Sequence, residues 1–383
     1  MAEVLELPQF KGRPGWEFTD LSGLELSRYT VVQAEPEGLA VPEPLFELEA
    51  GELPDGVIVT TIARARAEHP ELIERHLGRM VAADDLFTTL NDSAAYHSGA
   101  LVYVPRDVVV PDPISLRTVS PQDGTLLHGR TLIVLEPGAQ AEVWEQYLSA
   151  GAELDAVLNV VTELQVGENA SLRYVSGQAL AEQSWIFGAQ RAEVGRDGRL
   201  DWVALGFGAA HGRVRMETRL AGEGADARVT GAYATRGRQH IDFDTTQEHA
   251  APNTTSDLAF RGVLQGRSSA VWKGNIIVDP GAQKTDAFQE SRNLLISKRA
   301  HADAIPGLEI QANDVRCTHA AAVAQVDPEQ LFYLRSRGLP EEVAKRLVIE
   351  GFLSALVERF ETGPMRERLR EVLEHRLELI LSD

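Results

Sequence analysis

The sequence predicts a mainly β protein whose core is a β-solenoid, and three observations support this fold class. Short β-rich runs alternate with glycine turns from about residue 96 to residue 320. The turn glycines Gly138, Gly167, Gly195 and Gly222 are separated by 29, 28 and 27 residues. Helical patterns are few within this stretch and are found mainly in the segments before and after it. A repeat of this length is typical of solenoid proteins.

Each repeat unit has the same order of residue types, which is an apolar run, a glycine turn, polar residues and a new strand. The unit occurs as VLEPGAQAEVWEQY (134–147), LQVGENASLRYVSG (164–177), AEVGRDGRLDWVAL (192–205) and RLAGEGADARVTGA (219–232). Few helical patterns lie between the strands, which favours a β-solenoid over βαβ units. A β-sandwich with coincidental spacing is the alternative that the pattern leaves open.

The sequence divides into three regions that differ in the secondary structure their residue patterns predict. Residues 1–95 are predicted to form a mostly helical N-terminal region, residues 96–326 the solenoid core, and residues 327–383 a C-terminal helical domain. In the first region, apolar residues recur at helical spacing from Pro70 to Leu90, and a proline suits the start of a helix.

Three helices are predicted after residue 326. Asp327 can cap the first of them, Pro328 suits its first position, and Gly338 suits its end. A second helix is predicted over residues 340–360 and a third up to about Leu381, separated by a Gly-Pro pair. This region either caps the solenoid or binds a partner.

Composition and charge exclude several classes of protein. The formal net charge of −20 argues against a nucleic-acid partner and against anionic membrane surfaces. The single cysteine rules out an internal disulfide and is compatible with a reducing compartment. The N-terminus lacks the pattern of a secretory signal, and no apolar run reaches the about 18 residues of a membrane span. We therefore expect a soluble cytoplasmic protein.

The single cysteine, Cys317, lies two residues before His319. If this segment is a strand, the thiol and the imidazole share one face. Such a pair suits a soft metal, but an iron–sulfur cluster needs about four protein ligands. The missing ligands would have to come from another chain. The alternative is that Cys317 is a packed small hydrophobe and that His319 is structural.

A second polar cluster occurs in RQHIDFDTTQEH, residues 238–249. In a strand, His240, Asp242 and Asp244 share a face and could bind a divalent metal, and His249 lies nearby. The alternative is a polar outer face of a solenoid strand, with the apolar residues between them facing inward. The segment from Gly281 to Thr285 lacks the glycines of a phosphate-binding loop and predicts a turn followed by a strand.

The run LEIQANDVRCTHAAAVAQVDPEQLFYLRSRG (308–338) resembles the C-terminal signature of the SufB/SufD family of iron–sulfur cluster assembly proteins. Further similar runs are GWEFTDLSGL (15–24), LNDSAAYHSGALVYVP (90–105), QHIDFDTTQEHAAPNTTSDLAFRGVL (239–264) and GAQKTDAFQESRNLLIS (281–297). The resemblance covers nearly the whole chain. It implies a right-handed parallel β-helix flanked by helical N-terminal and C-terminal regions.

The resemblance also implies a non-catalytic subunit in a complex with the paralogue SufB and the ATPase SufC. His319 falls on the interface histidine of the SufD branch, and Cys317 on the neighbouring cysteine. The implied cofactor is a transient iron–sulfur cluster at the interface with SufB, with none held stably by this chain alone and with ATP bound to SufC. The expected contact with SufB is an edge or face within residues 308–325.

SufC is expected to dock on the C-terminal helical region. The candidate contacts are Phe332, Tyr333, Arg335 and Arg337, since aromatic and arginine side chains often anchor interfaces. The alternative is that the two aromatic residues are part of the core.

Two positions separate the branches of the family. SufB carries a scaffold cysteine where this chain has Ser291, and a glutamate after the histidine where this chain has Ala320. Both departures favour the SufD branch. Alone, the chain is expected to be a homodimer or a monomer. The alternative functions are a SufB-like scaffold that works as a homodimer and, less favoured, a β-helix enzyme acting on polysaccharide through the His240 face.

Overall fold

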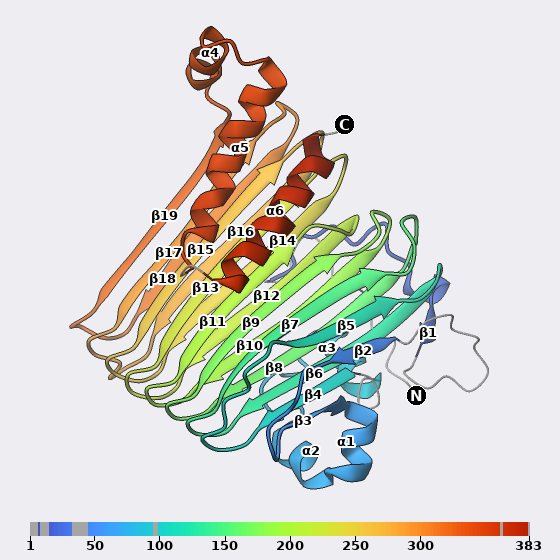
Figure 1. Cartoon of the computed structure of the whole chain (residues 1–383), viewed down its shortest axis with the longest axis vertical. Coiled ribbons are helices and arrows are strands. Elements are labelled where there is room, and N and C mark those ends of the chain that lie inside the picture. The colour runs from blue at the N-terminus through green and yellow to red at the C-terminus, as the bar shows by residue number, and fades with distance from the viewer. Residues whose placement is uncertain (1–6, 8–14, 33–44, 95–98, 361–362, 382–383) are drawn as a thin grey trace.

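The computed structural model describes residues 7, 15–32, 45–94, 99–360 and 363–381. Two long β-sheets face each other and form a flattened solenoid (Figure 1). Even-numbered strands from β4 to β18 follow one another in sheet A, and odd-numbered strands from β5 to β19 in sheet B. Each consecutive pair of strands is thus one turn of the solenoid. The predicted β-solenoid is confirmed, and the β-sandwich alternative is wrong.

The strands within the turns pair in parallel, and most of them are ten residues long. Sheet A contains β3 (Ile58–Thr61), β4 (Gly99–Val104), β6 (Thr125–Leu135), β8 (Val157–Val166), β10 (Trp185–Val194), β12 (His211–Leu220), β14 (His240–His249), β16 (Ser269–Val278) and β18 (His301–Ile310), with β1 (Thr30–Val32) paired to β6. Sheet B contains β2 (Phe46–Glu49), β5 (Ile114–Ser120), β7 (Gln140–Ser149), β9 (Ser171–Ala179), β11 (Arg199–Gly206), β13 (Asp226–Thr235), β15 (Thr255–Leu264), β17 (Asp286–Leu295) and β19 (Arg316–Gln325). Among these described strands, two pairs are antiparallel, which are β2 with β5 and β3 with β4.

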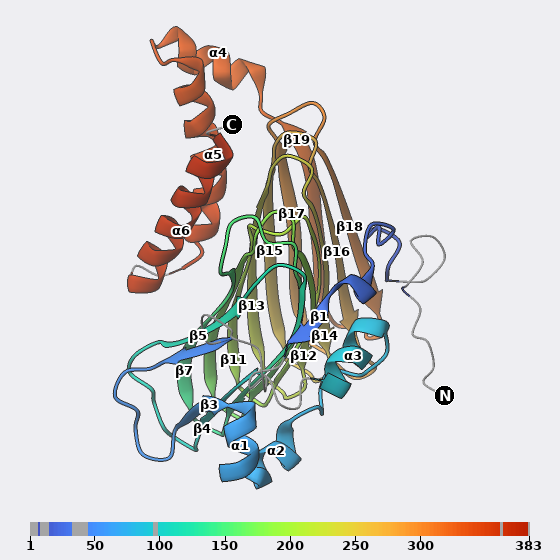
Figure 2. The ribbon, with the colours of Figure 1, turned by 90° about the vertical axis from the view of Figure 1, so that its right-hand side faces the viewer.

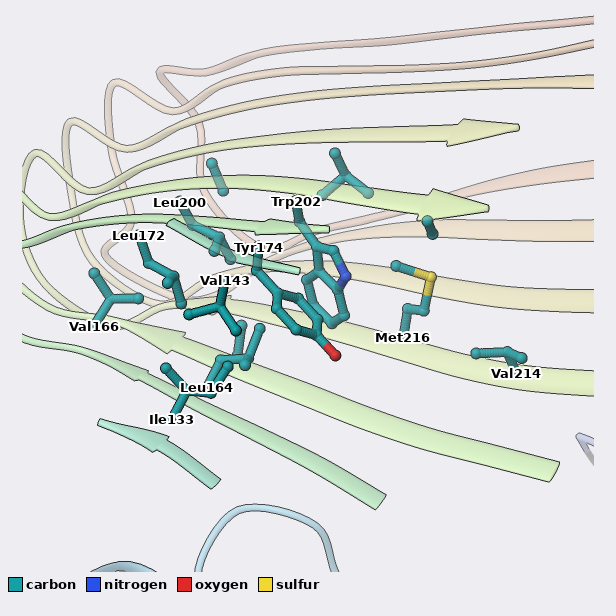
Figure 3. Packing of buried hydrophobic residues seen from close by; sticks show 14 of the residues in the cluster. Ile133, Val143, Leu164, Val166, Leu172, Tyr174, Leu200, Trp202, Val214 and Met216 are labelled. Atoms are coloured by element: carbon teal, nitrogen blue, oxygen red, sulfur yellow. The ribbon is translucent and has the colours of Figure 1, made fainter. Parts of the chain in front are cut away.

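The core lies between the two sheets, where side chains alternate inward and outward along each strand. Because neighbouring turns are in register, like positions stack on one another. Tyr174 and Trp202 are register partners, both are fully buried, and their ring centroids lie 5.9 Å apart. Figure 3 shows these rings beside Met216 and a group of buried aliphatic side chains. This packing holds successive turns together.

The turns that lead from sheet A to sheet B explain the glycine spacing in the sequence. Each of the seven that precede the β18–β19 turn contains a residue with positive φ, and its N–H donates to the next turn, as from Gly138 to the carbonyl of Glu168 at 2.8 Å. At Gly167 a side chain would lie 2.8 Å from the carbonyl oxygen of Leu135, so the turns can stack only without one. The positive-φ residues are Asp107, Gly138, Asn169, Asp197, Gly224, Asn253 and Lys284. The turn predicted near Thr285 is the one that joins β16 to β17.

The N-terminal helices α1 (Ile62–Glu68), α2 (Pro70–His76) and α3 (Leu86–Ala94) pack on the outer face of sheet A, after the short 3-10 helix η1 (Leu26–Arg28). The helical pattern predicted from Pro70 to Leu90 is wrong in its middle. Gly78 adopts a φ of +71° after the end of α2. The backbone N–H groups of Gly78, Met80 and Val81 donate to the buried carboxylate of Glu163 instead of continuing a helix.

The three predicted C-terminal helices are confirmed as α4 (Pro328–Ser336), α5 (Glu341–Val357) and α6 (Pro364–Leu381). The side chain of Asp327 caps α4 by accepting the N–H of Glu329 at 2.8 Å. Helices α5 and α6 lie along the outer face of sheet B, whereas α4 projects beyond the last strands (Figures 1 and 2). Among the described residues, none of the helices combines the length and the apolar character needed to cross a bilayer.

Candidate functional site

Both sheets stop at one end of the solenoid without a covering strand. β18 and β19 are the last strands of sheets A and B, and each pairs with only one other strand in the described chain. Their outer edges therefore present backbone N–H and C=O groups that no described strand satisfies. We call the surface formed by β18 and β19 the open end.

Side chains on the inward face, which is buried in the earlier turns, become exposed at the open end. Leu308 and Ile310 on β18 are 36% and 42% exposed. Their register partners one turn earlier, Ile276 and Val278, are fully buried. On β19, Val323 is 42% exposed in the same way. This apolar row on an unfinished solenoid is the kind of surface that another polypeptide covers.

The open end also contains the predicted thiol and imidazole. Cys317 and His319 lie in β19, and the strand places both on the inward face, as the sequence predicts. Cys317 is half-buried and packs against an apolar group that includes Ala287. Burial and the charge of Asp286 raise the pKa of the Cys317 thiol, which favours its protonated form. His319 is exposed, so the imidazole is the member of the pair that is available to a ligand or partner.

The four predicted docking residues lie on α4 and at its end. Phe332 is 74% exposed and Tyr333 is 57% exposed, so the alternative that they belong to the core is wrong. The guanidinium of Arg337 lies 5.2 Å from the ring centroid of Tyr333. Arg335 forms an ion pair with Glu341 at 3.3 Å, which ties α4 to the start of α5. Helix α4 thus carries two exposed aromatic rings and is tied to α5 by an ion pair. It follows β19 in the chain and projects beyond the last strands (Figure 2).

The polar cluster of residues 238–249 does not form a single site. His240, Asp242 and Asp244 share the outward face of β14, while His249 faces inward. His249 is fully buried, and its two ring nitrogens lie 2.8 and 2.9 Å from the hydroxyl oxygens of Thr254 and Ser256. Burial lowers the pKa of His249 to about 4, so this ring is neutral near pH 7.

The outward members of the cluster hold the N-terminal segment of the chain. Asp242 is buried and accepts the hydroxyl of Thr19 at 2.6 Å. Arg213 lies 3.7 Å from Asp242 and 3.3 Å from Asp244. Burial raises the pKa of Asp242 to about 6 and lowers that of His240 to about 4. In the described chain, no group of three or more His, Cys, Asp or Glu side chains is arranged to hold a metal ion.

Two residues that the sequence did not single out lie beside these sites. Arg213 joins the N-terminal segment to the outward cluster, and no local motif marks it. Gln289 is the register partner of His319, 30 residues earlier in the chain. The repeat length could have identified Gln289, because a position one repeat before a site residue lies next to it in a solenoid.

The fold and the open end together define a parallel β-solenoid protein in which the described chain leaves β18 and β19 uncovered beside a helical arm. Family models show the family to which this protein belongs. The model described as "SUF system FeS cluster assembly, SufBD core domain" matches residues 117–352, and "SufBD protein N-terminal region" matches residues 45–116. The chain belongs to the SufBD family of iron–sulfur cluster assembly proteins.

Individual relatives agree with the family models. The chain is 35% identical to the iron–sulfur cluster assembly protein SufD of Bacillus subtilis over 84% of its own length and 74% of the relative. It is 33% identical to a SufBD family protein of Mycobacterium tuberculosis over 76% of its length and 74% of the relative. A chloroplast protein of Arabidopsis thaliana, ABCI7, is 26% identical over 95% of the chain and 81% of the relative.

Proposed function

We propose that this chain is the SufD-type subunit of a cytoplasmic SufBCD-type complex and that it has no catalytic activity of its own. Its open end pairs with a SufB-type paralogue, and a transient iron–sulfur cluster, the cargo of the complex, is assembled at that interface. The observation that carries the proposal is the exposure of the apolar inward face and of His319 on β18 and β19.

The side chains at the branch-specific positions support a SufD-type role rather than a self-sufficient scaffold. Ser291, at the position of the scaffold cysteine, is fully buried between the sheets. Ala320, at the position of the glutamate after the histidine, has no group that can ligate metal. A homodimer of this chain would bring together only two thiols, both from Cys317, which is fewer than a cluster needs.

The C-terminal arm is the proposed docking site for a SufC-type ATPase, which binds ATP. Phe332 and Tyr333 on α4 offer exposed aromatic area, and such side chains contribute strongly to interfaces. The alternative of a polysaccharide-acting enzyme finds no support in the outward cluster. Asp242 is covered by the N-terminal segment and paired with Arg213, so a sugar chain has no access to it.

Co-expression with the SufB-type and SufC-type proteins tests the proposal. Size-exclusion chromatography with light scattering should show one stable complex of the three proteins, and the chain alone should elute as a homodimer or monomer. Separate elution of the three proteins at micromolar concentration would contradict the complex. Leu308→Asp places a charge on the open end and should weaken pairing with the SufB-type chain while leaving SufC-type binding intact.

A further inference from the structure

We propose that a cleft between α2 and the outer face of sheet A binds a free α-amino acid with an apolar side chain. The cleft has a volume of about 400 Å³, which is within the range of small-molecule sites. Helix α2 lies at the end of the solenoid opposite to β19 (Figures 1 and 2). The proposal therefore concerns a second site and does not depend on pairing at the open end.

Three neighbouring strands of sheet A and the turn after β6 form one wall of the cleft, which we call the sheet wall. Val134 on β6, Gln165 on β8 and Glu193 on β10 are register partners and form a row on the outward face. The turn after β6 adds Glu136 and Pro137. Both acidic residues that line the cleft, Glu136 and Glu193, thus lie on the sheet wall.

The end of α2 and the segment after it form the other wall, which we call the helical wall. His76, Arg79 and Met80 line the cleft from this side. The Nδ1 of His76 lies 2.6 Å from the Oε1 of Gln165, which joins the two walls. The buried carboxylate of Glu163 accepts the N–H groups of the residues before and after Arg79, at 2.7 and 2.9 Å. The helical wall is therefore held in place before a ligand arrives, which lowers the cost of binding.

The charges of the cleft are separated by wall, with basic side chains on the helical wall and acidic ones on the sheet wall. Glu193 is shared with Arg219, at 3.5 Å. Arg79 donates to the backbone carbonyl of Glu74 at 2.9 Å and keeps further guanidinium N–H groups. Neither Arg79 nor Glu136 forms an ion pair with another described side chain. One cation and one carboxylate are thus available to a ligand.

This arrangement fits a small zwitterion. The guanidinium of Arg79 can bind the carboxylate of an amino acid through two parallel hydrogen bonds. The carboxylate of Glu136 can accept the N–H groups of its ammonium group. Met80, Val134 and Pro137 supply apolar surface for its side chain. A ligand with one charge would satisfy one wall and leave the charge of the other wall unpaired, so a zwitterion is favoured over a simple anion or cation.

Ligand-observed NMR titration of the full chain with three probes of similar size tests the charge requirement. L-Leucine carries both charges, 4-methylpentanoate lacks the ammonium group, and 3-methylbutylamine lacks the carboxylate. We expect L-leucine to bind with a dissociation constant of about 1 mM or lower. Each analogue should bind at least about tenfold more weakly, because it loses hydrogen bonds to a charged group.

Two substitutions assign the charges to the two walls. Arg79→Gln should weaken the binding of L-leucine about tenfold and leave that of 3-methylbutylamine unchanged. Glu136→Gln should also weaken the binding of L-leucine about tenfold, but should leave that of 4-methylpentanoate unchanged. Arg75→Gln is the matched control, because Arg75 is an exposed cation on α2 that does not line the cleft. It should bind L-leucine within about twofold of the wild type.

Three results would overturn the proposal, with folding of each variant checked by circular dichroism. Equal affinity for the three probes would show that the charges of the cleft do not select a zwitterion. No binding of L-leucine at millimolar concentration would show that the cleft is not an amino-acid site. Wild-type affinity for L-leucine in both Arg79→Gln and Glu136→Gln would place the binding outside the cleft.

Discussion

The guanidinium of Arg213 lies over the ring of Trp16, 4.6 Å from its centroid, and its Nε donates to the carbonyl of Gly15 at 2.7 Å. Trp16 and Gly15 belong to the N-terminal segment, whereas Arg213 lies on β12. The same guanidinium faces Asp242 and Asp244 at 3.7 and 3.3 Å, and the Arg213 side chain is only 6% exposed. One buried cation therefore fastens the N-terminal segment to two carboxylates on the outer face of sheet A.

Arg213→Ala should destabilise the fold strongly, because it leaves Asp242 buried without its cation. Removal of one partner of a buried pair typically costs about 3–5 kcal/mol. Urea unfolding measures this cost, and limited proteolysis should show cleavage before residue 30. The control is Arg215→Ala on the same strand, which pairs with the half-exposed Asp84 at 3.0 Å and should cost at most about 1 kcal/mol. Equal effects of the two substitutions would contradict the fastening role.

Three histidines whose pKa values are lowered should make the fold sensitive to acid. Burial lowers the pKa values of His128, His240 and His249 to about 4. The same side chains titrate near pH 6.5 when the chain is unfolded, as for model imidazoles. Between these pH values the unfolded chain binds more protons than the folded chain. Stability is therefore complete above about pH 6.5 and falls as the pH approaches 4, by about 1.4 kcal/mol per pH unit for each imidazole.

Two of the buried acids oppose this trend. Burial raises the pKa of Asp242 to about 6 and also raises that of Glu145, so their protonation on acidification stabilises the fold. A substitution isolates the contribution of one histidine. In His249→Asn, the free energy of unfolding measured in urea should fall less steeply from pH 7 to pH 5 than in the wild type, by the equivalent of one proton. Identical slopes for the two proteins would show that His249 is already charged in the folded state.

The positive-φ turns that join sheet A to sheet B allow a test of backbone strain. Two substitutions in these turns should change the free energy of unfolding in opposite directions. Lys284 has a φ of +64° and Asn253 a φ of +58° in consecutive turns. The left-handed region costs most residues about 1–2 kcal/mol, but asparagine tolerates it. Lys284→Asn should therefore raise the free energy of unfolding by about 1 kcal/mol despite losing an exposed ion pair with Asp314. Asn253→Lys should lower it, and thermal unfolding measures both changes.

The sequence predicts the solenoid well because its information is local and repeated. Gly138 and Gly167 mark turns whose backbone conformation or close approach excludes side chains, and this requirement recurs at a nearly constant interval. The helix over residues 70–90 was overpredicted for the opposite reason. The break after α2 depends on the carboxylate of Glu163, which lies 82 residues beyond Val81 and leaves no mark on the local helical pattern.

The same distinction between local pattern and long-range contact applies to the candidate sites. Alternation along a strand correctly places Cys317 and His319 on one face, and it places Asp242 outward. It does not reveal that the N-terminal segment covers Asp242, since that contact joins Thr19 to a residue 223 positions away. Alternation also places His249 on the inward face, but it does not reveal that the ring contacts the hydroxyl groups of Thr254 and Ser256. These features arise from tertiary packing.

His319→Ala should impair cluster loading without affecting folding, because His319 is exposed in the isolated chain. Its free energy of unfolding should change by less than about 0.5 kcal/mol, as for other exposed positions. Cys317→Ser should be milder for loading, since the thiol packs against Ala287 and is favoured in its protonated form. Iron and sulfide analysis of the co-purified complex, with circular dichroism as a control, measures both. Lost folding together with lost loading in His319→Ala would support a structural role.

The docking role of α4 can be tested separately from the stability of the chain. Phe332 and Tyr333 are 74% and 57% exposed, so the double substitution to Ala should change the free energy of unfolding by less than about 1 kcal/mol. Loss of two aromatic anchors should weaken binding of the SufC-type ATPase at least about tenfold, measured by titration calorimetry. Val343→Ala, at a 41% exposed position on α5, is the control and should bind within about twofold of the wild type. A chain truncated after Val326 that folds and still binds the ATPase would place the docking site elsewhere.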